Sequence, residues 1–277
     1  MNSLEIILWL LALGAGSVSG YYTCLATNWT FFWVGILVVP VAFLLFFGLW
    51  VLFLFIWGAC LKTKEERPNF SRFYYHVIYV TDATFLRVVN VSFRWHGLQK
   101  MPKDHHFVLV CNHLSNFDQM ILIAALRRRN QPMAWISKPE NMSFPIAGPF
   151  IHHAGFIPIN RTNPIEGMKS LQKGVRYIQE NQCCVGICPE GTRNKTDAVL
   201  LDFHPGSFSM AIWAKVPTVV ICLKHTKEIK KRSPWRHTCV SIDVVDVIQP
   251  EEYVDKRPSD ISARARAAIL EDLETAY

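Results

Sequence analysis

Charged side chains are almost absent from the first 61 residues of this 277-residue sequence, where Glu5 is the single exception. The other 216 residues carry 29 basic and 21 acidic side chains, which is normal for a soluble globular domain and gives it a net charge of +8. This split excludes disorder, collagen, a coiled coil or a polytopic transporter as a description of the whole chain. We expect a membrane-embedded helix pair over residues 1–66 and a basic globular domain over residues 67–277.

Closely spaced cysteine pairs are also missing. None of the eight cysteines belongs to a C-x-x-C pair, and several lie within apolar runs that resemble strands, where a reduced cysteine acts as a small hydrophobe. A zinc site built from Cys183, Cys184 and Cys188 with a distant histidine is therefore disfavoured, and no metal is expected. The pattern favours a reducing compartment over a disulfide framework.

One apolar run is long enough to cross a bilayer. Residues 31–57 contain no charged or strongly polar side chain, and 27 helical residues extend about 40 Å, more than the roughly 30 Å hydrocarbon core. A weaker apolar stretch, residues 6–18, precedes it without the basic start of a signal peptide. Two helices joined by an uncharged turn over residues 21–30 fit this pattern, whether they span the bilayer or enter one leaflet.

Basic residues follow the long apolar run directly: Lys62, Lys64, Arg67 and Arg72. By the positive-inside tendency, these charges place the globular domain on the cytoplasmic face of the membrane.

The globular part alternates strand-like and helical segments, which predicts an α/β domain with a mostly parallel sheet flanked by helices. Strands are expected at 107–111, 134–137, 156–159, 184–188, 218–223 and 239–247, and helices at 118–128, 164–180, 207–214 and from Ser259 to the C-terminus. Asn163 and Pro164 are a helix-start signal, with Glu166 reaching back toward the cap. Ligands of such sheets bind beyond the carboxyl ends of the strands, so the residues that follow each strand are candidates for chemistry.

A histidine and an aspartate follow the first of these strands. His113 and Asp118 would lie about 140° apart on one continuous helix, so they can meet only if His113 precedes the helix and Asp118 lies in its first turn. Asp118 could then accept a hydrogen bond from one imidazole nitrogen and leave the other as a general base. A capping loop with an incidental histidine is the alternative.

Two further segments contain groups suited to an anion. Arg161 precedes the start of a capped helix, which suits a phosphate and equally suits a solvated loop. The segment Pro189–Arg193 follows a buried strand and contains Glu190, Gly191, Thr192 and Arg193 side by side. This segment is either an anion-binding site or an ordinary polar turn.

Taken in order, these segments resemble the lysophosphatidic acid acyltransferase (PlsC) family of glycerolipid acyltransferases. The family's N-H-x4-D block is matched by Asn112, His113 and Asp118, and its G-x-I-x-I-x-R block by residues 155–161. Its F-P-E-G-T-R-S block is similar to residues 188–194, and its V-P run to residues 216–220. Departures are Cys188 for Phe, Asn194 for Ser and residues 204–206 in place of a lysine-containing K-x-G.

The resemblance implies acyl transfer from acyl-CoA or acyl carrier protein to the free hydroxyl of lysophosphatidic acid, giving phosphatidic acid. His113 would be the general base and Asp118 its orienting partner. Backbone N–H groups near residues 190–193 would hold the oxyanion, with Glu190, Gly191 and Thr192 as substrate-binding residues. Arg161 and Arg193 would bind the phosphate, with Lys138 as a further cation, while Glu190 would either orient Arg193 or bind an acceptor hydroxyl. No permanently bound cofactor is implied.

The sequence contains two basic clusters, residues 127–129 and 224–236. They would attract anionic headgroups or an acidic acyl carrier. The alternative is that these charges only form a solvated face.

Nucleic-acid binding is a poor fit, because the domain is membrane-tethered and has no motif that reads nucleic acid. The alternatives are an acyltransferase for glycerol 3-phosphate or another lysophospholipid, and a non-catalytic membrane-anchored lipid-binding protein. A serine hydrolase is disfavoured because no G-x-S-x-G occurs.

Overall fold

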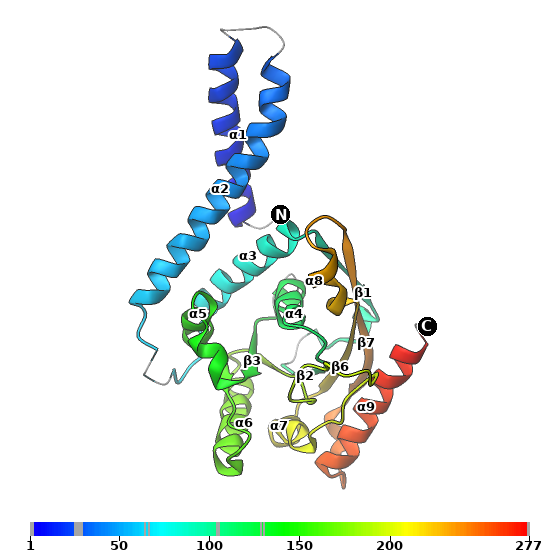
Figure 1. Ribbon diagram of the computed structural model, residues 1–277. Helices are drawn as coiled ribbons and strands as arrows, with labels where there is room; N and C mark the ends of the chain where they lie inside the picture. The colour runs from blue at the N-terminus through cyan, green and yellow to red at the C-terminus, as the bar shows by residue number, and fades with distance from the viewer. Residues whose placement is uncertain are drawn as a thin grey trace.

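The computed structural model describes residues 3–24, 30–63, 65, 67–103, 106–127, 129 and 131–275, with the side chains of 19–24 and 30–37 left aside. Two N-terminal helices, α1 (Ser3–Cys24) and α2 (Thr30–Cys60), form a hairpin that projects from the rest of the molecule (Figure 1). The turn expected over residues 21–30 is shorter, because Tyr21–Cys24 continue α1 and Thr30 begins α2; residues 25–29 lie outside the described residues. Of the described residues, Val38–Cys60 form the one helix long and apolar enough to cross a membrane, and Ser3–Val18 are a shorter apolar helix.

The remaining chain alternates helices and strands. The helices are α3 (Arg72–Val88), α4 (Phe117–Arg127), α5 (Ala147–Ala154), α6 (Pro164–Gln179), α7 (Ser209–Ala214), α8 (Ile229–Arg232) and α9 (Pro258–Glu274). The strands are β1 (Val91–His96), β2 (Val108–Cys111), β3 (Met133–Ser137), β4 (Ile157–Pro158), β5 (Cys184–Ile187), β6 (Thr218–Lys224) and β7 (Thr238–Ile248). Short 3-10 turns lie at Leu98–Lys100, Pro139–Ser143, Pro205–Phe208, Thr226–Glu228 and Pro250–Tyr253.

The strands form one seven-stranded mixed sheet in the order β1-β7-β6-β2-β5-β3-β4. Every neighbouring pair is parallel except β6 and β7, which are antiparallel. The segment between β6 and β7 is short and contains the 3-10 turn Thr226–Glu228 and the one-turn helix α8, and an antiparallel pair needs no crossover across the sheet. The expected mostly parallel sheet is thus present, with this one reversal that the sequence pattern did not predict.

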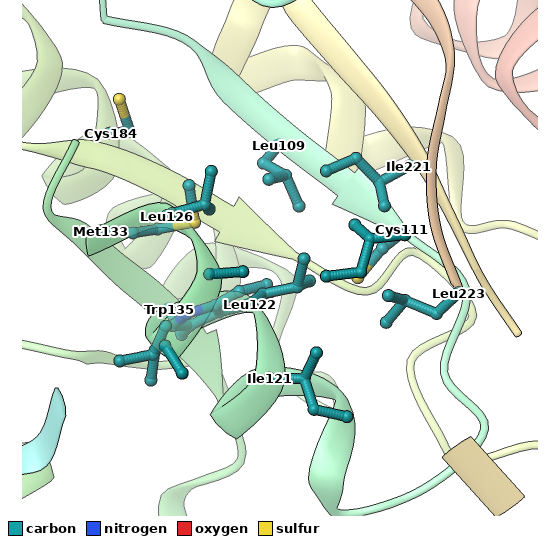
Figure 2. Packing of buried hydrophobic residues seen from close by; sticks show 14 of the residues in the cluster. Leu109, Cys111, Ile121, Leu122, Leu126, Met133, Trp135, Cys184, Ile221 and Leu223 are labelled. Atoms are coloured by element: carbon teal, nitrogen blue, oxygen red, sulfur yellow. The ribbon is translucent and has the colours of Figure 1, made fainter. Parts of the chain in front are cut away.

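Alternate side chains of the central strands enter two hydrophobic cores, one on each face of the sheet. Leu109 and Cys111 of β2 pack with α3 and α4, in the core drawn in Figure 2. Val108 and Val110 point to the opposite face and pack with α6, α7 and α9. Because helices cover both faces of the sheet, a ligand can reach the sheet only at the ends of its strands.

The boundaries of three expected elements differ. The strand expected at residues 156–159 is reduced to two residues, because Pro158 has no N–H to donate and β4 lies at the sheet edge. The helix expected at residues 207–214 starts as a 3-10 turn and becomes α-helical at Ser209. The last helix begins at Pro258, not after a Ser259 cap, because Asp260 accepts a hydrogen bond from the Arg257 N–H at 2.9 Å.

The helix hairpin packs against the globular part through α3 and α5. Leu4, Leu8 and Phe47 form a small hydrophobic cluster with Val80 of α3. At the far end of α2, the ring centroid of Trp57 lies 5.0 Å from that of Phe150 in α5. The hairpin therefore lies directly beside the face of the domain that α3 covers.

Candidate active site

The candidate residues follow four parallel strands whose carboxyl ends lie on the same side of the sheet. His113 comes two residues after β2, Arg161 three after β4, Arg193 six after β5, and Lys138 immediately after β3. The register of these neighbouring parallel strands brings the segments to the same edge.

Asn112 fixes the position of the loop that carries His113. The fully buried Asn112 side chain donates to the Leu223 carbonyl at 2.9 Å and accepts from the Leu223 N–H at 2.7 Å. It thereby extends the β2–β6 pairing by a side chain where the main chain of β2 has already turned away. This role was not predicted from the sequence, because the partner is 111 residues away along the chain.

His113 and Asp118 are in contact across the start of α4. The His113 Nδ1 atom lies 2.9 Å from Asp118 Oδ2, and the same oxygen accepts from the backbone N–H groups of Leu114 at 2.7 Å and Ser115 at 2.8 Å. The second oxygen, Oδ1, accepts from Ser115 Oγ at 3.2 Å. A carboxylate buried completely is thus compensated by four donors.

This arrangement assigns the imidazole tautomer. An ionised carboxylate can only accept, so Nδ1 of His113 carries the hydrogen and Nε2 has a free lone pair. Burial of the ring lowers the pKa of His113, but the hydrogen bond to Asp118 and the carboxylates of Asp118 and Glu190 raise it by more, so the net pKa lies above its usual value. The ring is therefore a stronger base than an isolated histidine.

Glu190 supports the same loop from the opposite side. Its Oε1 accepts from the His113 backbone N–H at 2.6 Å, and its Oε2 accepts from the Leu201 N–H at 3.2 Å. Burial raises the pKa of Glu190, and the two backbone donors partly offset that rise. The carboxylate therefore holds the main chain of the histidine loop and of Leu201 together.

The turn after β5 presents backbone donors beside His113. Gly191 has a φ of 71°, which favours glycine, and its N–H donates to the Cys188 carbonyl at 3.0 Å. The Asn194 N–H donates to the His113 carbonyl at 2.8 Å, which ties the end of this turn to the histidine loop. Within the part of the chain that the structure describes, the N–H groups of Thr192 and Arg193 have no acceptor.

Arg161 lies directly against this turn. The point that a Cβ atom on Gly191 would occupy is 3.0 Å from Arg161 Nη1 and 2.9 Å from the ring of His204. Arg193 is half-buried and forms no ion pair with any described residue. The structure therefore brings two of the three expected cations, Arg161 and Arg193, to the Gly191 turn. The third, Lys138, is exposed and is not among the described residues that line the cavity beside His113.

An apolar cavity of about 390 Å³ opens beside His113. Its walls come from α2, α3, α4 and α5 and include Leu54, Ile78, Met120 and Phe150. One of the lining residues, Asp82 of α3, is an acid whose pKa burial raises to about 8, so it is mostly protonated at neutral pH. The cavity was not predicted from the sequence, because it exists only where four separate helices meet.

Two thiols lie beneath the site. The sulfur atoms of Cys111 and Cys188, at the carboxyl ends of β2 and β5, are 3.6 Å apart, and both side chains are buried. Burial keeps them from a substrate, so they act here as packing groups. No group of three or more potential metal ligands occurs among the residues that the structure describes.

A family model described as Acyltransferase matches residues 92–224, which contain the histidine loop, the Arg161 segment and the Gly191 turn. The resemblance inferred from the sequence is therefore confirmed for this part of the α/β domain.

Relatives with established names extend this match. The chain is 23% identical over 208 residues to the 1-acyl-sn-glycerol-3-phosphate acyltransferase of Saccharomyces cerevisiae, covering 74% of this chain and 65% of that protein, slightly less than two thirds. It is 26% identical to 1-acyl-sn-glycerol-3-phosphate acyltransferase alpha of Mus musculus, covering 79% of this chain and 75% of the relative. The crystal structure of the 1-acyl-sn-glycerophosphate (LPA) acyltransferase PlsC from Thermotoga maritima matches with a TM-score of 0.58 at 17% identity, over 73% of this chain and 79% of that one. That likeness establishes a shared fold.

Proposed function

We propose that this protein transfers a fatty acyl group from a thioester donor to the free hydroxyl of lysophosphatidic acid, producing phosphatidic acid. The observation that carries the proposal is the His113–Asp118 contact, 2.9 Å long, at the mouth of an apolar cavity. A protein that only bound lipid would need no oriented base, so this contact favours an enzyme over a membrane-anchored lipid-binding protein. The names of the relatives support the choice of acceptor.

In this mechanism, Nε2 of His113 removes the proton from the acceptor hydroxyl as its oxygen attacks the thioester carbonyl carbon. The C–S bond then breaks, the thiolate leaves, and the proton on Nε2 is returned to the departing sulfur. Asp118 stabilises the imidazolium that forms in between. The reaction requires neither a covalent acyl-enzyme nor a resident cofactor.

Charge develops on the thioester oxygen during the attack and needs donors that are already in place. The backbone N–H groups of Thr192 and Arg193 are suited to this role, because they have no acceptor among the described residues and directly follow Gly191 in the turn after β5. We assign the acceptor phosphate to the guanidinium groups of Arg161 and Arg193, because arginine matches phosphate geometry with paired hydrogen bonds. Lys138 is a weaker candidate for this phosphate site.

The apolar cavity suits an acyl chain. Each CH₂ transferred from water to apolar walls contributes about 0.8 kcal/mol, so a long chain would bind chiefly through this cavity. Leu54 of α2 is one of its lining residues. We infer that the hairpin α1–α2 enters the membrane as a unit, forms a segment over residues 1–66, and keeps domain 67–277 on the cytoplasmic face.

The acceptor is tested by comparing substrates. Purified full-length protein in vesicles is given lysophosphatidate, glycerol 3-phosphate or lysophosphatidylcholine, each with acyl-CoA and with acyl carrier protein as donor. The proposal predicts the highest kcat/KM with lysophosphatidate. A preference for glycerol 3-phosphate or for lysophosphatidylcholine would assign the alternative acceptor, and lipid binding without turnover would assign the non-catalytic function.

A further inference from the structure

Asp82 is an ionisable side chain that the proposed mechanism does not use. It belongs to α3, which packs between the helix hairpin and the sheet: Val80 contacts the hairpin, and Tyr75 and Leu86 belong to the core on the α3 face of the sheet. Asp82 itself is half-buried and lines the cavity beside His113. A carboxyl group is therefore part of a wall that is otherwise mostly apolar.

The Asp82 carboxyl group has no partner within the part of the chain that the structure describes. It forms neither a hydrogen bond nor an ion pair there, and burial alone raises its pKa to about 8, with no contribution from a nearby charge. A polar group enclosed without a partner is costly. Such groups are found preferentially at functional sites, where a ligand can supply the missing partner.

Thr81 shows the contrast, because it is the neighbour of Asp82 and lines the same cavity. Its hydroxyl donates to the Val77 carbonyl at 2.9 Å and accepts from Trp50 Nε1 at 3.2 Å. The hydrogen bonds of Thr81 are thus made within the protein, whereas the carboxyl group of Asp82 is left for a ligand.

Asp82 lies near the start of the helix that orients His113. Three residues further along α3, the ring of Phe85 stacks on that of Phe117, with the ring centroids 6.4 Å apart. Phe117 begins α4 and directly precedes Asp118. Because one turn of a helix rises about 5.4 Å, Asp82 is roughly one turn of α3 away from this stack. Since Asp82 and His113 also line one cavity, a single ligand can contact both.

Lysophosphatidate has three polar groups: the free hydroxyl, the phosphate and the ester that joins the chain to the glycerol. The proposed function gives the hydroxyl to His113 and the phosphate to Arg161 and Arg193, so the ester carbonyl still lacks a donor. The ester is a few bonds from the reacting hydroxyl and carries the apolar chain. With the hydroxyl at His113 and the chain in the apolar cavity, the ester lies between the two. A carbonyl can only accept a hydrogen bond, and a protonated carboxyl group can donate one.

We propose that the Asp82 carboxyl group donates a hydrogen bond to the ester carbonyl of lysophosphatidate and thereby selects acceptors whose chain is joined through an ester. The inference rests on the proposed function and deepens it, because it identifies a residue that distinguishes a 1-acyl from a 1-O-alkyl acceptor. The ether analogue has no carbonyl and leaves the acid without a partner, which weakens its binding. Asp82 sets specificity in this account and takes no part in proton transfer at His113.

The test compares two soluble acceptors that differ only in this carbonyl, 1-hexanoyl-glycerol 3-phosphate and its 1-O-hexyl ether. The Kd of each is measured by calorimetry on full-length protein in detergent micelles, so no turnover is needed. The readout is the ratio of the ether Kd to the ester Kd, in which the contacts of the phosphate and the hydroxyl cancel. We expect this ratio to be about three- to tenfold higher in wild type than in Asp82→Leu, which keeps the size of the side chain and removes the donor.

Two further variants separate the donor from its surroundings. Asp82→Asn retains an N–H donor and should keep most of the wild-type ratio. Thr81→Val is the matched control, because it removes a polar group from the same wall that already has its partners, and it should leave the ratio unchanged. All variants are compared at equal amounts of folded protein, as judged by thermal unfolding.

The pH dependence of the ratio gives a readout on the wild-type protein itself. Asp82 loses its proton as pH rises through about 8, so the ratio should then fall toward that of Asp82→Leu, while Asp82→Asn should keep a constant ratio. Among the described residues that line the cavity, His113 is the only other titratable one, and its protonation affects both acceptors alike. The amides of Asn116 and Gln119 line the same cavity but do not titrate.

An equal ratio in wild type and Asp82→Leu, or a wild-type ratio that stays constant across this pH range, would overturn the proposal. An effect of Asp82→Leu confined to the KM of the thioester donor would overturn it as well and assign Asp82 to the donor. If neither acceptor binds to wild type, the proposed acceptor is wrong and the inference about Asp82 fails with it. If both bind with the same ratio in every variant, only the inference about Asp82 fails.

Discussion

Replacing Asp118 with asparagine separates the charge of this side chain from its geometry. Its Oδ2 atom accepts three N–H groups, two of them from the backbone of Leu114 and Ser115. Because backbone N–H groups only donate, the asparagine oxygen must occupy this place, and its NH₂ group then faces the Ser115 hydroxyl, which can accept. Asp118→Asn therefore keeps the His113 tautomer.

The cost of this substitution follows from the lost charge. A hydrogen bond to a charged group contributes about 1.5–3 kcal/mol and a neutral one about 0.5–1.5 kcal/mol, a difference of about 1–1.5 kcal/mol. We expect kcat to fall about tenfold. Because Asp118 raises the pKa of His113, and the base must be neutral, the acid limb of the pH–rate profile should also move to lower pH.

The assay is kcat against pH for wild type, Asp118→Asn and Asp118→Ala, with thermal unfolding measured in parallel. Asp118→Ala should also lose stability, since it leaves two backbone N–H groups without their acceptor, at about 1–3 kcal/mol each if both stay buried. A thousandfold loss in Asp118→Asn, or an acid limb that does not move, would refute this account of Asp118.

Three other perturbations test separate parts of the site. Arg161→Ala and Arg193→Ala should raise the KM for lysophosphatidate about ten- to hundredfold; a rise in the donor KM instead would show that they contact the thioester. Deletion of residues 1–61 removes Leu54 from the cavity wall and should lower activity on membrane-embedded acceptor. Activity should recover partly on a short-chain soluble acceptor. Equal activity on both acceptors would show that the segment is only an anchor. The folded state keeps a proton on Asp82 that the unfolded chain releases, so the stability of the protein falls as pH rises toward about 8. Asp82→Asn should remove this dependence of stability on pH, measured by thermal unfolding across pH. An unchanged dependence would contradict the burial of this acid.

The elements that the sequence predicted are those specified by local pattern. The cap of α6 is an example: Asn163 accepts from the N–H groups of Ile165 at 3.1 Å and Glu166 at 3.4 Å, next to Pro164 in the first turn. β1 was not predicted, because its partner β7 lies more than 100 residues away along the chain. The reversal of β7 was not predicted either, because the hydrophobic pattern of a strand does not specify its direction in the sheet. α5 was missed as well, since its eight residues are too few for a clear helical period.

The site was predictable to the same degree. The approach of His113 to Asp118 follows from a strand, a turn and a capped helix, all within one short segment. Other contacts of the site join segments that are far apart in the sequence and could not be predicted from residue spacing. These are the contacts of Glu190 with the backbone of His113 and Leu201, and those of Asn112 with Leu223. A single buried polar residue at the end of an apolar run, such as Asn112, is the one signal that could have pointed to such a contact.

The most direct test of the central claim, that His113 is the general base, is the rate of acyl transfer by His113→Ala. Initial rates with lysophosphatidate and acyl-CoA are compared with those of wild type and of His237→Ala, a histidine outside the site, at equal amounts of folded, vesicle-bound protein. The account predicts a rate at the uncatalysed background for His113→Ala, with unchanged membrane binding, and a wild-type rate for His237→Ala. Transfer by folded His113→Ala within about tenfold of wild type would contradict it, since general-base catalysis contributes roughly a hundredfold or more.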